Sequence, residues 1–198
     1  MRASHRRGEA KARLYGLATA LPPYQAGEPA VKRFMASLAE ATLKGRRRAL
    51  TLDFMGKIYD SSGILRRHSV LADYTKDSPE DFEFYPANWA LEPFPTTAAR
   101  MKLYETWSVD LAEEACRKAL RESGALPAEV THLIFTTCTG LFAPGPDILL
   151  LGRLGLGPQV QRAVLGFMGC YAGFNGLRMS GQILGAEPEA VVLQVCVE

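Results

Sequence analysis

Cys170 is the residue of this sequence whose neighbours best fit nucleophilic chemistry. It follows the apolar run Ala163–Met168, which is short and lacks polar alternation, so we predict a strand buried on both faces. From Tyr171 onward, the apolar residues fall at helical spacing. The thiol is therefore expected in a tight turn at a helix N-terminus, where unpaired backbone amides favour thiolate over thiol. A cysteine placed there is a candidate nucleophile, whereas a cysteine in an apolar segment is otherwise an inert buried side chain.

A second polar cluster follows another predicted strand. The stretch Thr131–Thr137 reads as a buried strand, and Thr137, Cys138 and Thr139 come at its carboxyl end. In open α/β sheets, ligands bind beside the carboxyl ends of the strands. The position of this cluster therefore favours a role in ligand binding.

Composition and cysteine spacing exclude several classes of protein. The 198 residues are 47% hydrophobic, which is enough for one substantial core, and the formal net charge of +2 does not call for a nucleic-acid partner. No stretch reaches the roughly 18 apolar residues of a membrane span. The four cysteines show no CxxC spacing and no nearby histidine cluster, so neither a metal site nor a disulfide framework is predicted. Free thiols fit a reducing cytoplasm.

Periodicity and turn residues predict the elements that must position these side chains. Residues 1–12 are polar and basic and are predicted to be a disordered tail, and Arg13–Ala20 is predicted to be a strand. Thr96 and Thr97 offer an N-cap for a long helix, and Asp147 is predicted to cap a short one. The remaining predictions are helices at Glu28–Ala39, Ala49–Tyr59, Ala98–Ser123 and Asp147–Leu154, a turn at Ser61–Gly63, an extended segment at Ile64–Leu71, a loop at Asp73–Pro95 with one helical turn near Pro79–Phe82, and a buried strand at Ala190–Val197.

The last predicted strand is not followed by a helix, which leaves the βαβ pattern open. A lobe with only these elements would expose one face of its sheet. We therefore expect the chain to be the first half of a larger structure.

Four blocks of sequence, in this order, resemble the type III polyketide synthases. The resemblance runs from about Arg13 onward and is nearest to the bacterial members that make alkylpyrones or alkylresorcinols, with chalcone and stilbene synthases more distantly similar. A GCxAG pattern alone would also fit ketoacyl-carrier-protein synthase III. The blocks are SSGILRRHSVL (Ser61–Leu71), FPTTAARMKLY (Phe94–Tyr104), THLIFTTCTGLFAPGPDI (Thr131–Ile148) and GFMGCYAGFNGLR (Gly166–Arg178).

The resemblance implies an α/β chain with a thiolase-like fold. Residues 13–198 would form the N-terminal, cysteine-bearing lobe of a two-lobe αβαβα architecture, without the C-terminal lobe. The activity implied is that of an acyltransferase, which condenses an acyl-CoA starter with malonyl-CoA through a cysteine thioester to build a polyketide such as a pyrone or a resorcinol. CoA thioesters are then substrates, no cofactor or metal is implied, and a cytoplasmic homodimer or pairing with a second lobe is expected.

Site residues carry over from the family by position. Cys170 matches the acyl-bearing nucleophile, and the side chains of Thr137, Cys138 and Thr139 match the segment that shapes the starter and cyclisation cavity. Cys138 stands where plant members carry threonine, so the cavity is expected to differ from the plant type.

The CoA-binding positions of the plant enzymes match Phe54, Lys57 and Ser61, of which Lys57 alone is charged. CoA binding would then use other residues, such as Arg66 and Arg67, or be weak.

The resemblance also implies a catalytic histidine and asparagine from the second lobe. The histidines of this sequence, His5, His68 and His132, do not match that position. Two alternatives therefore stay open beside the polyketide synthase reading: a non-catalytic half-enzyme that acts as an interaction partner, and a relative of ketoacyl synthase III, against which the SSGILRRHSVL and TTAARM blocks argue. A reactive, acylatable Cys170 would favour the enzyme, and an inert thiol would favour the interaction partner.

Overall fold

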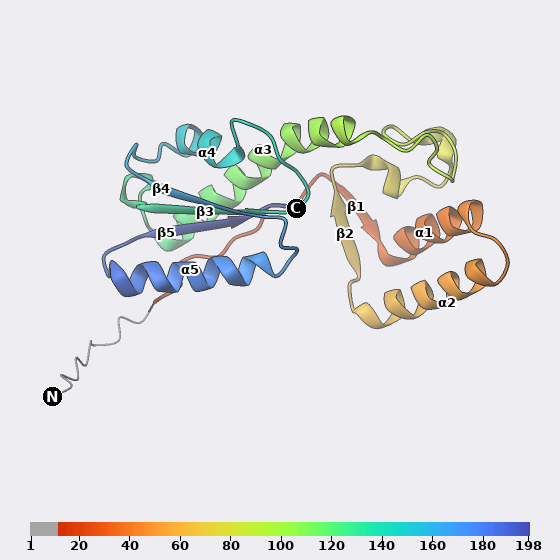
Figure 1. The fold of residues 1–198 in the computed structure, drawn as a ribbon, viewed down its shortest axis with the longest axis horizontal. Helices are drawn as coiled ribbons and strands as arrows, with labels where there is room; N and C mark the ends of the chain where they lie inside the picture. The colour runs from red at the N-terminus through yellow and green to blue at the C-terminus, as the bar shows by residue number, and fades with distance from the viewer. Residues whose placement is uncertain (1–11) are drawn as a thin grey trace. The chain divides into compact units, whose positions relative to one another are not determined.

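The computed structural model describes residues 12–198, which form two compact units. The first unit, called the sheet unit, contains residues 12–20 and 101–198; the second contains residues 21–100 (Figure 1). Of the tail predicted at residues 1–12, all but Ala12 lies outside the described residues.

The sheet unit is built on a parallel three-stranded sheet in the order β4-β3-β5. Helices α3 and α4 lie on one side of the sheet and α5 lies on the other (Figure 1). The pairing aligns Thr137 of β3 with Gly166 of β4, and Thr136 of β3 with Cys196 of β5, so the three strands end at one edge. The elements are α3 (Thr97–Ser123), a 3-10 turn η3 (Pro127–Glu129), β3 (His132–Thr137), α4 (Pro146–Leu154), β4 (Gln161–Gly166), α5 (Ala172–Ala186) and β5 (Val192–Cys196).

The central strand β3 is buried along its whole length, as the sequence predicted. Leu133 and Phe135, both fully buried, pack in one cluster with Val109 and Cys116 of α3 and with Leu150 of α4. Side chains alternate along a strand, so the residues between them face α5. The predicted strand at Ala190–Val197 is also confirmed, since β5 pairs with β3.

The strand β4 is an edge strand, so the prediction that it is buried on both faces was wrong. Val164, in the middle of the strand, is 49% exposed. β4 lies at one end of the strand order, so one of its sides has no neighbouring strand in the described residues, and none of its residues is buried.

The helix predicted after Cys170 is α5, and its small residues bring it close to the sheet. A Cβ atom added at Gly176 would lie 2.5 Å from Nε2 of Gln194 on β5. The same Nε2 atom donates a hydrogen bond to the carbonyl oxygen of Gly173 at 2.9 Å. Contact between α5 and the sheet therefore depends on glycine at this position.

The strand predicted at Arg13–Ala20 is absent, because no strand in the described residues pairs with this segment. It is held instead by α3. The amide of Leu17 donates to the carboxylate of Glu122 at 3.2 Å, and Nζ of Lys118 donates to the carbonyl of Thr19 at 3.3 Å. Side-chain contacts to one helix replace the ladder that a strand requires.

The predicted helix caps give one success and one error. Thr96 caps α3, because its Oγ1 atom accepts a hydrogen bond from the amide of Ala99 at 3.2 Å. Asp147 does not cap α4, whose N-cap is Gly145. The buried carboxylate of Asp147 pairs instead with the guanidinium of Arg162 on β4, so a long-range ion pair outcompetes the local cap.

The second unit joins two helices to a two-stranded antiparallel sheet. The predicted helices and the extended segment are present, although α2 runs on to Ser62 and ends only at Gly63, whose φ is +67°. In the long predicted loop, the buried carboxylate of Asp73 accepts hydrogen bonds from the amides of Phe84 and Tyr85 at 3.1 and 2.8 Å. The elements are β1 (Tyr24–Gly27), α1 (Glu28–Thr42), α2 (Gly45–Ser62), β2 (Arg66–Ser69), η1 (Ala72–Thr75) and η2 (Pro79–Asp81).

Candidate active site

The turn between β4 and α5 presents Cys170 to solvent. Between the end of β4 at Gly166 and the start of α5 at Ala172, the backbone of Phe167 and Gly169 has positive φ angles of 57° and 67°, which bend the chain sharply. The amide of Ala172 donates a hydrogen bond to the carbonyl oxygen of Gly169 at 2.9 Å and closes the turn around the cysteine. The predicted placement of an exposed thiol between a strand and a helix is confirmed.

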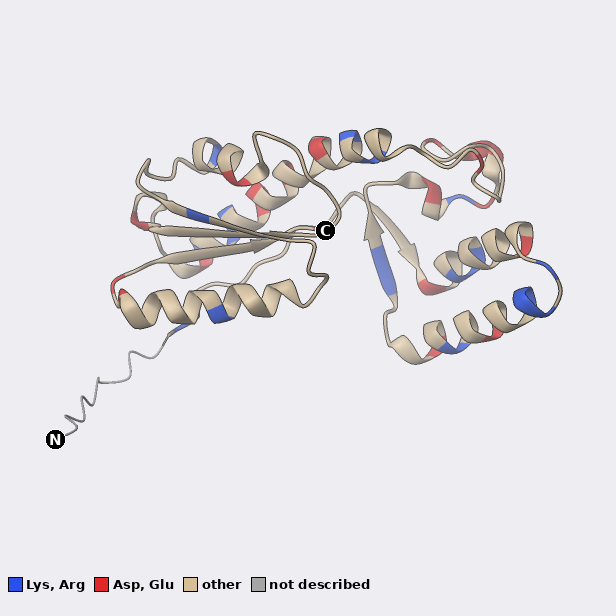
Figure 2. Ribbon diagram, viewed as in Figure 1, with Lys and Arg blue, Asp and Glu red and all other residues tan. Residues whose placement is uncertain are grey.

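The helix that follows the turn supplies a positive electrostatic field. Its N-cap residue, Tyr171, makes no side-chain cap hydrogen bond, and the first turn contains no acidic residue. The neighbouring elements add little charge, since β3 has no lysine, arginine or carboxylate and α5 has only Arg178 (Figure 2). The dipole of α5 therefore favours negative charge beside this turn.

Thr137 and Cys138 lie beside the turn, as the parallel pairing of β3 and β4 requires. The carbonyl oxygen of Thr137 accepts a hydrogen bond from the amide of Phe167 at 3.3 Å, and the sulfur of Cys138 accepts one from the amide of Gly169 at 2.9 Å. Thr139 is the next residue and is exposed. The structure thus brings two of the three residues of the predicted cavity segment into contact with the turn that carries Cys170.

Tyr104 of α3 is a residue of this site that the sequence analysis missed. Its hydroxyl lies 2.8 Å from Oγ1 of Thr137, and its ring lies so close to Gly140 that a Cβ there would be 2.1 Å from the ring. Burial raises the pKa of the Tyr104 phenol, which keeps it neutral and able to donate. The sequence signal was its place at the end of the FPTTAARMKLY block, and no role was predicted for it.

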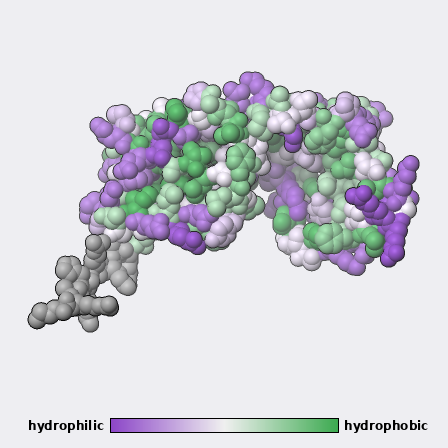
Figure 3. Space-filling view, in the orientation of Figure 1, coloured by the Kyte–Doolittle hydropathy of each residue, from purple (hydrophilic) through white to green (hydrophobic). Residues whose placement is uncertain are grey.

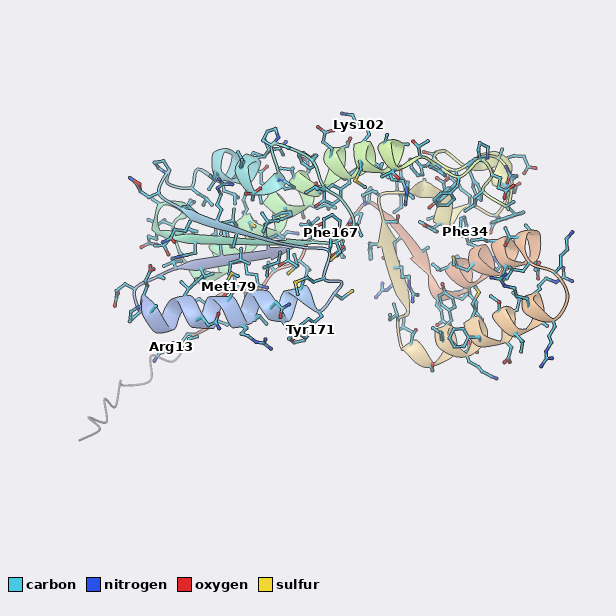
Figure 4. All side chains as sticks on the ribbon, in the orientation of Figure 1. Arg13, Phe34, Lys102, Phe167, Tyr171 and Met179 are labelled. Atoms are coloured by element: carbon cyan, nitrogen blue, oxygen red, sulfur yellow. The ribbon has the colours of Figure 1, made fainter. Side chains whose placement is uncertain are left out.

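Apolar side chains surround the thiol at the surface. Phe167 and Tyr171, labelled in Figure 4, lie at the same end of the sheet unit, and they are 72% and 53% exposed. Phe174 and Leu177 of α5 are also more than half exposed. Figure 3 shows hydrophobic residues mixed with hydrophilic ones on the visible face of the sheet unit. We call Phe167, Met168, Tyr171, Phe174 and Leu177 the α5 apolar surface.

Lys57, the predicted CoA-binding residue, lies on α2 in the second unit. Its ammonium group is 2.7 Å from the carboxylate of Asp53, one turn earlier on the same helix. Of the alternative arginines, Arg67 lies over the ring of Tyr59 at 5.0 Å, and its Nη1 atom is buried without a hydrogen-bond partner in the described residues. The charge of Lys57 is partly compensated by Asp53.

The histidine in the described residues of the sheet unit lies away from the thiol. His132 is buried at the amino end of β3, whereas Cys138 follows the carboxyl end. His68 lies on β2 in the second unit, and His5 lies outside the described residues. Within residues 12–198, no group of three or more His, Cys, Asp or Glu side chains could hold a metal ion. No helix in that range is long and apolar enough to cross a bilayer.

Comparison with known sequences gives a family match over nearly the whole chain. Residues 2–198 match the family described as chalcone and stilbene synthases, N-terminal domain. A type III polyketide synthase of Penicillium soppii is 34% identical over 169 residues, which cover 85% of this chain and 38% of that protein. An alpha-pyrone synthesis polyketide synthase-like protein of Mycobacterium tuberculosis is 37% identical over 103 residues, which cover 52% of this chain and 26% of that protein.

Solved structures agree with the sequence match. A polyketide synthase from the brown alga Ectocarpus siliculosus superposes with a TM-score of 0.76 at 28% identity, covering 93% of this chain and 47% of that chain. The type III polyketide synthase domain of a Dictyostelium hybrid synthase gives a TM-score of 0.73 at 27% identity, over 92% of this chain and 46% of that domain. These neighbours confirm the predicted α/β, thiolase-like fold, and the chain spans about half the length of each or less.

Proposed function

The chain belongs to the chalcone and stilbene synthase family, as its N-terminal domain, and on that premise we propose that it is the cysteine-bearing part of a type III polyketide synthase. The proposed reaction condenses an acyl-CoA starter with malonyl-CoA through a thioester on Cys170, and a pyrone or resorcinol-like product follows. One observation carries the proposal: the exposed thiol of Cys170 lies at the carboxyl edge of a parallel sheet and at the start of α5.

The first proposed step is acyl transfer to the thiol. The Cys170 thiolate attacks the thioester carbonyl of the acyl-CoA, a new carbon–sulfur bond forms, and the bond to the CoA sulfur breaks, so that CoA leaves as a thiolate and takes up a proton. Negative charge that develops beside the turn is favoured by the dipole of α5. The described part of the chain holds the side chain needed for this step.

The second proposed step needs groups from outside the described residues. Malonyl-CoA loses CO₂ to give an enolate, whose carbon attacks the carbonyl of the acyl thioester; a carbon–carbon bond forms, the bond to the Cys170 sulfur breaks, and the cysteine leaves as a thiolate. The carbonyl of malonyl-CoA must be held by hydrogen-bond donors while CO₂ is lost. His132 is buried at the far end of β3 and cannot serve. We propose that the histidine and asparagine of the family come from a second lobe, in keeping with a chain that spans 38% of its Penicillium relative.

The substrate-binding residues are also proposals. Thr137, Cys138 and Thr139 are proposed to line the acyl cavity, because the first two contact the nucleophile turn. Lys57 is proposed to bind a CoA phosphate in exchange for its contact with Asp53, an exposed ion pair that is worth at most about 1 kcal/mol.

We further propose that the enzyme is a cytoplasmic homodimer. The support for a dimer is the edge strand β4, whose half-exposed Val164 and free edge offer backbone groups to a second copy. The support for the cytoplasm is the presence of four free thiols.

A second candidate function is that of a non-catalytic half-enzyme. The α5 apolar surface favours it, because exposed contiguous apolar surface marks an interaction site. In this reading, the chain pairs with a full-length relative and Cys170 stays unacylated.

Acylation of Cys170 separates the two functions. The purified chain is incubated with a long-chain acyl-CoA, and intact mass is measured. We expect an acyl adduct that is lost in Cys170→Ala and kept in Cys196→Ala, which removes another exposed thiol at the same sheet edge. Addition of malonyl-CoA and a histidine- and asparagine-bearing second lobe should then give pyrone or resorcinol products. If no adduct forms on Cys170, the interaction reading replaces the enzymatic one.

A further inference from the structure

The turn that carries Cys170 is held in a conformation that its own sequence does not favour. Phe167 has a φ of 57°, in the left-handed region that bulky residues with a Cβ avoid, and Gly169 has a φ of 67°. A non-glycine residue in that region costs on the order of 1–3 kcal/mol and persists only where neighbouring structure holds it. Contacts from outside the turn must therefore supply this restraint.

Packing of the turn's own side chains does not supply it. Phe167 and Met168 are 72% and 51% exposed, and Gly169 and Cys170 are exposed as well. Few buried apolar contacts hold the segment, so backbone hydrogen bonds to its neighbours decide its conformation.

Two such bonds connect the turn to the end of β3. The amide of Phe167 donates to the carbonyl of Thr137 at 3.3 Å, which extends the ladder between β3 and β4 by one bond. The amide of Gly169 donates to the sulfur of Cys138 at 2.9 Å. The second bond is the one made by a side chain, and it lies directly before the nucleophile.

We propose that Cys138 is a positioning residue for Cys170. Its sulfur accepts a hydrogen bond from the Gly169 amide and ties the turn to the end of β3, so that the thiol of the next residue stays at the start of α5. This inference rests on the proposed role of Cys170 as a nucleophile, but it concerns the reactivity of the thiol and does not depend on polyketide synthesis.

The choice of side chain at position 138 has a physical consequence. A thiol sulfur is a weak acceptor, so a hydroxyl oxygen in the same place can replace it, whereas a methyl group cannot. Serine and threonine at this position should therefore retain the tether, and alanine should release the turn.

The test is the rate at which iodoacetamide alkylates Cys170 in the full 198-residue chain, with the modified residue located by peptide mass spectrometry. The turn held by the Gly169–Cys138 hydrogen bond differs from the released turn by that one bond. We therefore expect about a tenfold slower reaction in Cys138→Ala and recovery to within about twofold of the native rate in Cys138→Ser. Cys196→Ala, which removes a thiol from the same edge without touching the turn, should react at the native rate. An unchanged rate in Cys138→Ala, or an equal loss in the serine variant, overturns the proposal.

A measurement on the native chain guards against variants that fail to fold. Although Gly169 is exposed, its amide hydrogen should exchange with solvent about tenfold or more slowly than the neighbouring amide of Met168, for which no hydrogen bond is present in the described residues. Equal exchange rates of the two amides would refute the tether. Failure of acyl transfer with a normal alkylation pattern would instead refute the proposed function and leave the positioning role intact.

Discussion

The core of the sheet unit and the outer face of α5 differ in how far their apolar side chains are exposed. On the side of α3 and α4, Leu133, Phe135 and Leu150 have no exposed surface. On the other side, α5 approaches the sheet through small residues and leaves Phe174 and Leu177 of its outer face 67% and 58% exposed. The centre of the sheet unit is a buried core, whereas the outer face of α5, the helix that follows Cys170, keeps exposed apolar side chains. Buried packing and exposed apolar surface therefore belong to different parts of this unit.

The largest expected contrast is between two cysteines. Burial raises the pKa of Cys116, on the α3 side, to about 12. At pH 8, four units lower, only about one thiol in 10⁴ is ionised, and the thiolate is the form that iodoacetamide attacks. We expect Cys170 to be alkylated at least about 10³-fold faster than Cys116, as measured by peptide mass spectrometry at pH 8.

The raised pKa of Cys116 also makes the free energy of unfolding depend on pH. Above the ordinary pKa of a thiol, near 8.5, the unfolded chain loses the Cys116 proton before the folded chain does. Stability should therefore be complete below that pH and should fall as the pH rises toward 12. Comparable labelling of Cys116 and Cys170 at pH 8 would contradict the contrast between the buried core and the exposed turn.

Core truncation should show the next largest contrast. Phe135→Ala removes a fully buried ring from the core and is expected to lower the free energy of unfolding by about 3–5 kcal/mol. Phe174→Ala removes a ring of the same kind from the α5 apolar surface and should change it by no more than about 0.5 kcal/mol. Urea unfolding followed by circular dichroism measures both values. Equal losses would mean that α5 is covered in solution.

A smaller effect is expected where α5 meets the sheet. Gly176→Ala places a methyl group 2.5 Å from Nε2 of Gln194 and should destabilise the chain by about 1–3 kcal/mol. Gly181→Ala, in the same helix, meets nothing within 4 Å and should stabilise it by up to about 1 kcal/mol. The pair is compared by thermal unfolding. A neutral result at Gly176 would indicate that α5 lies further from β5.

The smallest expected effect concerns the bond between Tyr104 and Thr137. Thr137→Val removes the buried hydroxyl that lies 2.8 Å from the phenol, and about 1 kcal/mol of stability should be lost. The exposed neighbour provides the control, since Thr139→Val should change stability by less than about 0.5 kcal/mol. The free energy of unfolding of both variants is measured in urea. A loss in Thr139→Val and none in Thr137→Val would contradict the hydrogen bond between Tyr104 and Thr137.

Much of the sheet unit follows from local sequence. The runs Thr131–Thr137 and Ala190–Val197 gave strands because short, mainly apolar runs fit a sheet with helices on both faces. Thr96 capped α3 because the bonds of a cap are made within a few residues. The turn at Cys170 was predictable for the same reason, since a change of period from strand to helix requires a bend between them.

The errors occurred where a distant segment decides the outcome. The segment Arg13–Ala20 has the composition of a strand but pairs with no strand in the described residues. The carboxylate of Asp147 forms an ion pair with Arg162 on β4 and does not cap its own helix. The exposure of β4 depends on its place at the sheet edge, which its own residues do not specify. A strand or a cap is predicted locally, but its partner is chosen by the whole fold.

The sequence by itself determined most of the strands and helices of the sheet unit, the thiol at the bend and, through its resemblance to a family, the kind of reaction to expect. Only the tertiary structure brought Cys138 to the turn and Tyr104 to Thr137, because both contacts join residues more than 30 positions apart in the chain. Contacts of that length depend on which strands become neighbours. The order β4-β3-β5, which no single segment encodes, sets the end of β3 beside the nucleophile.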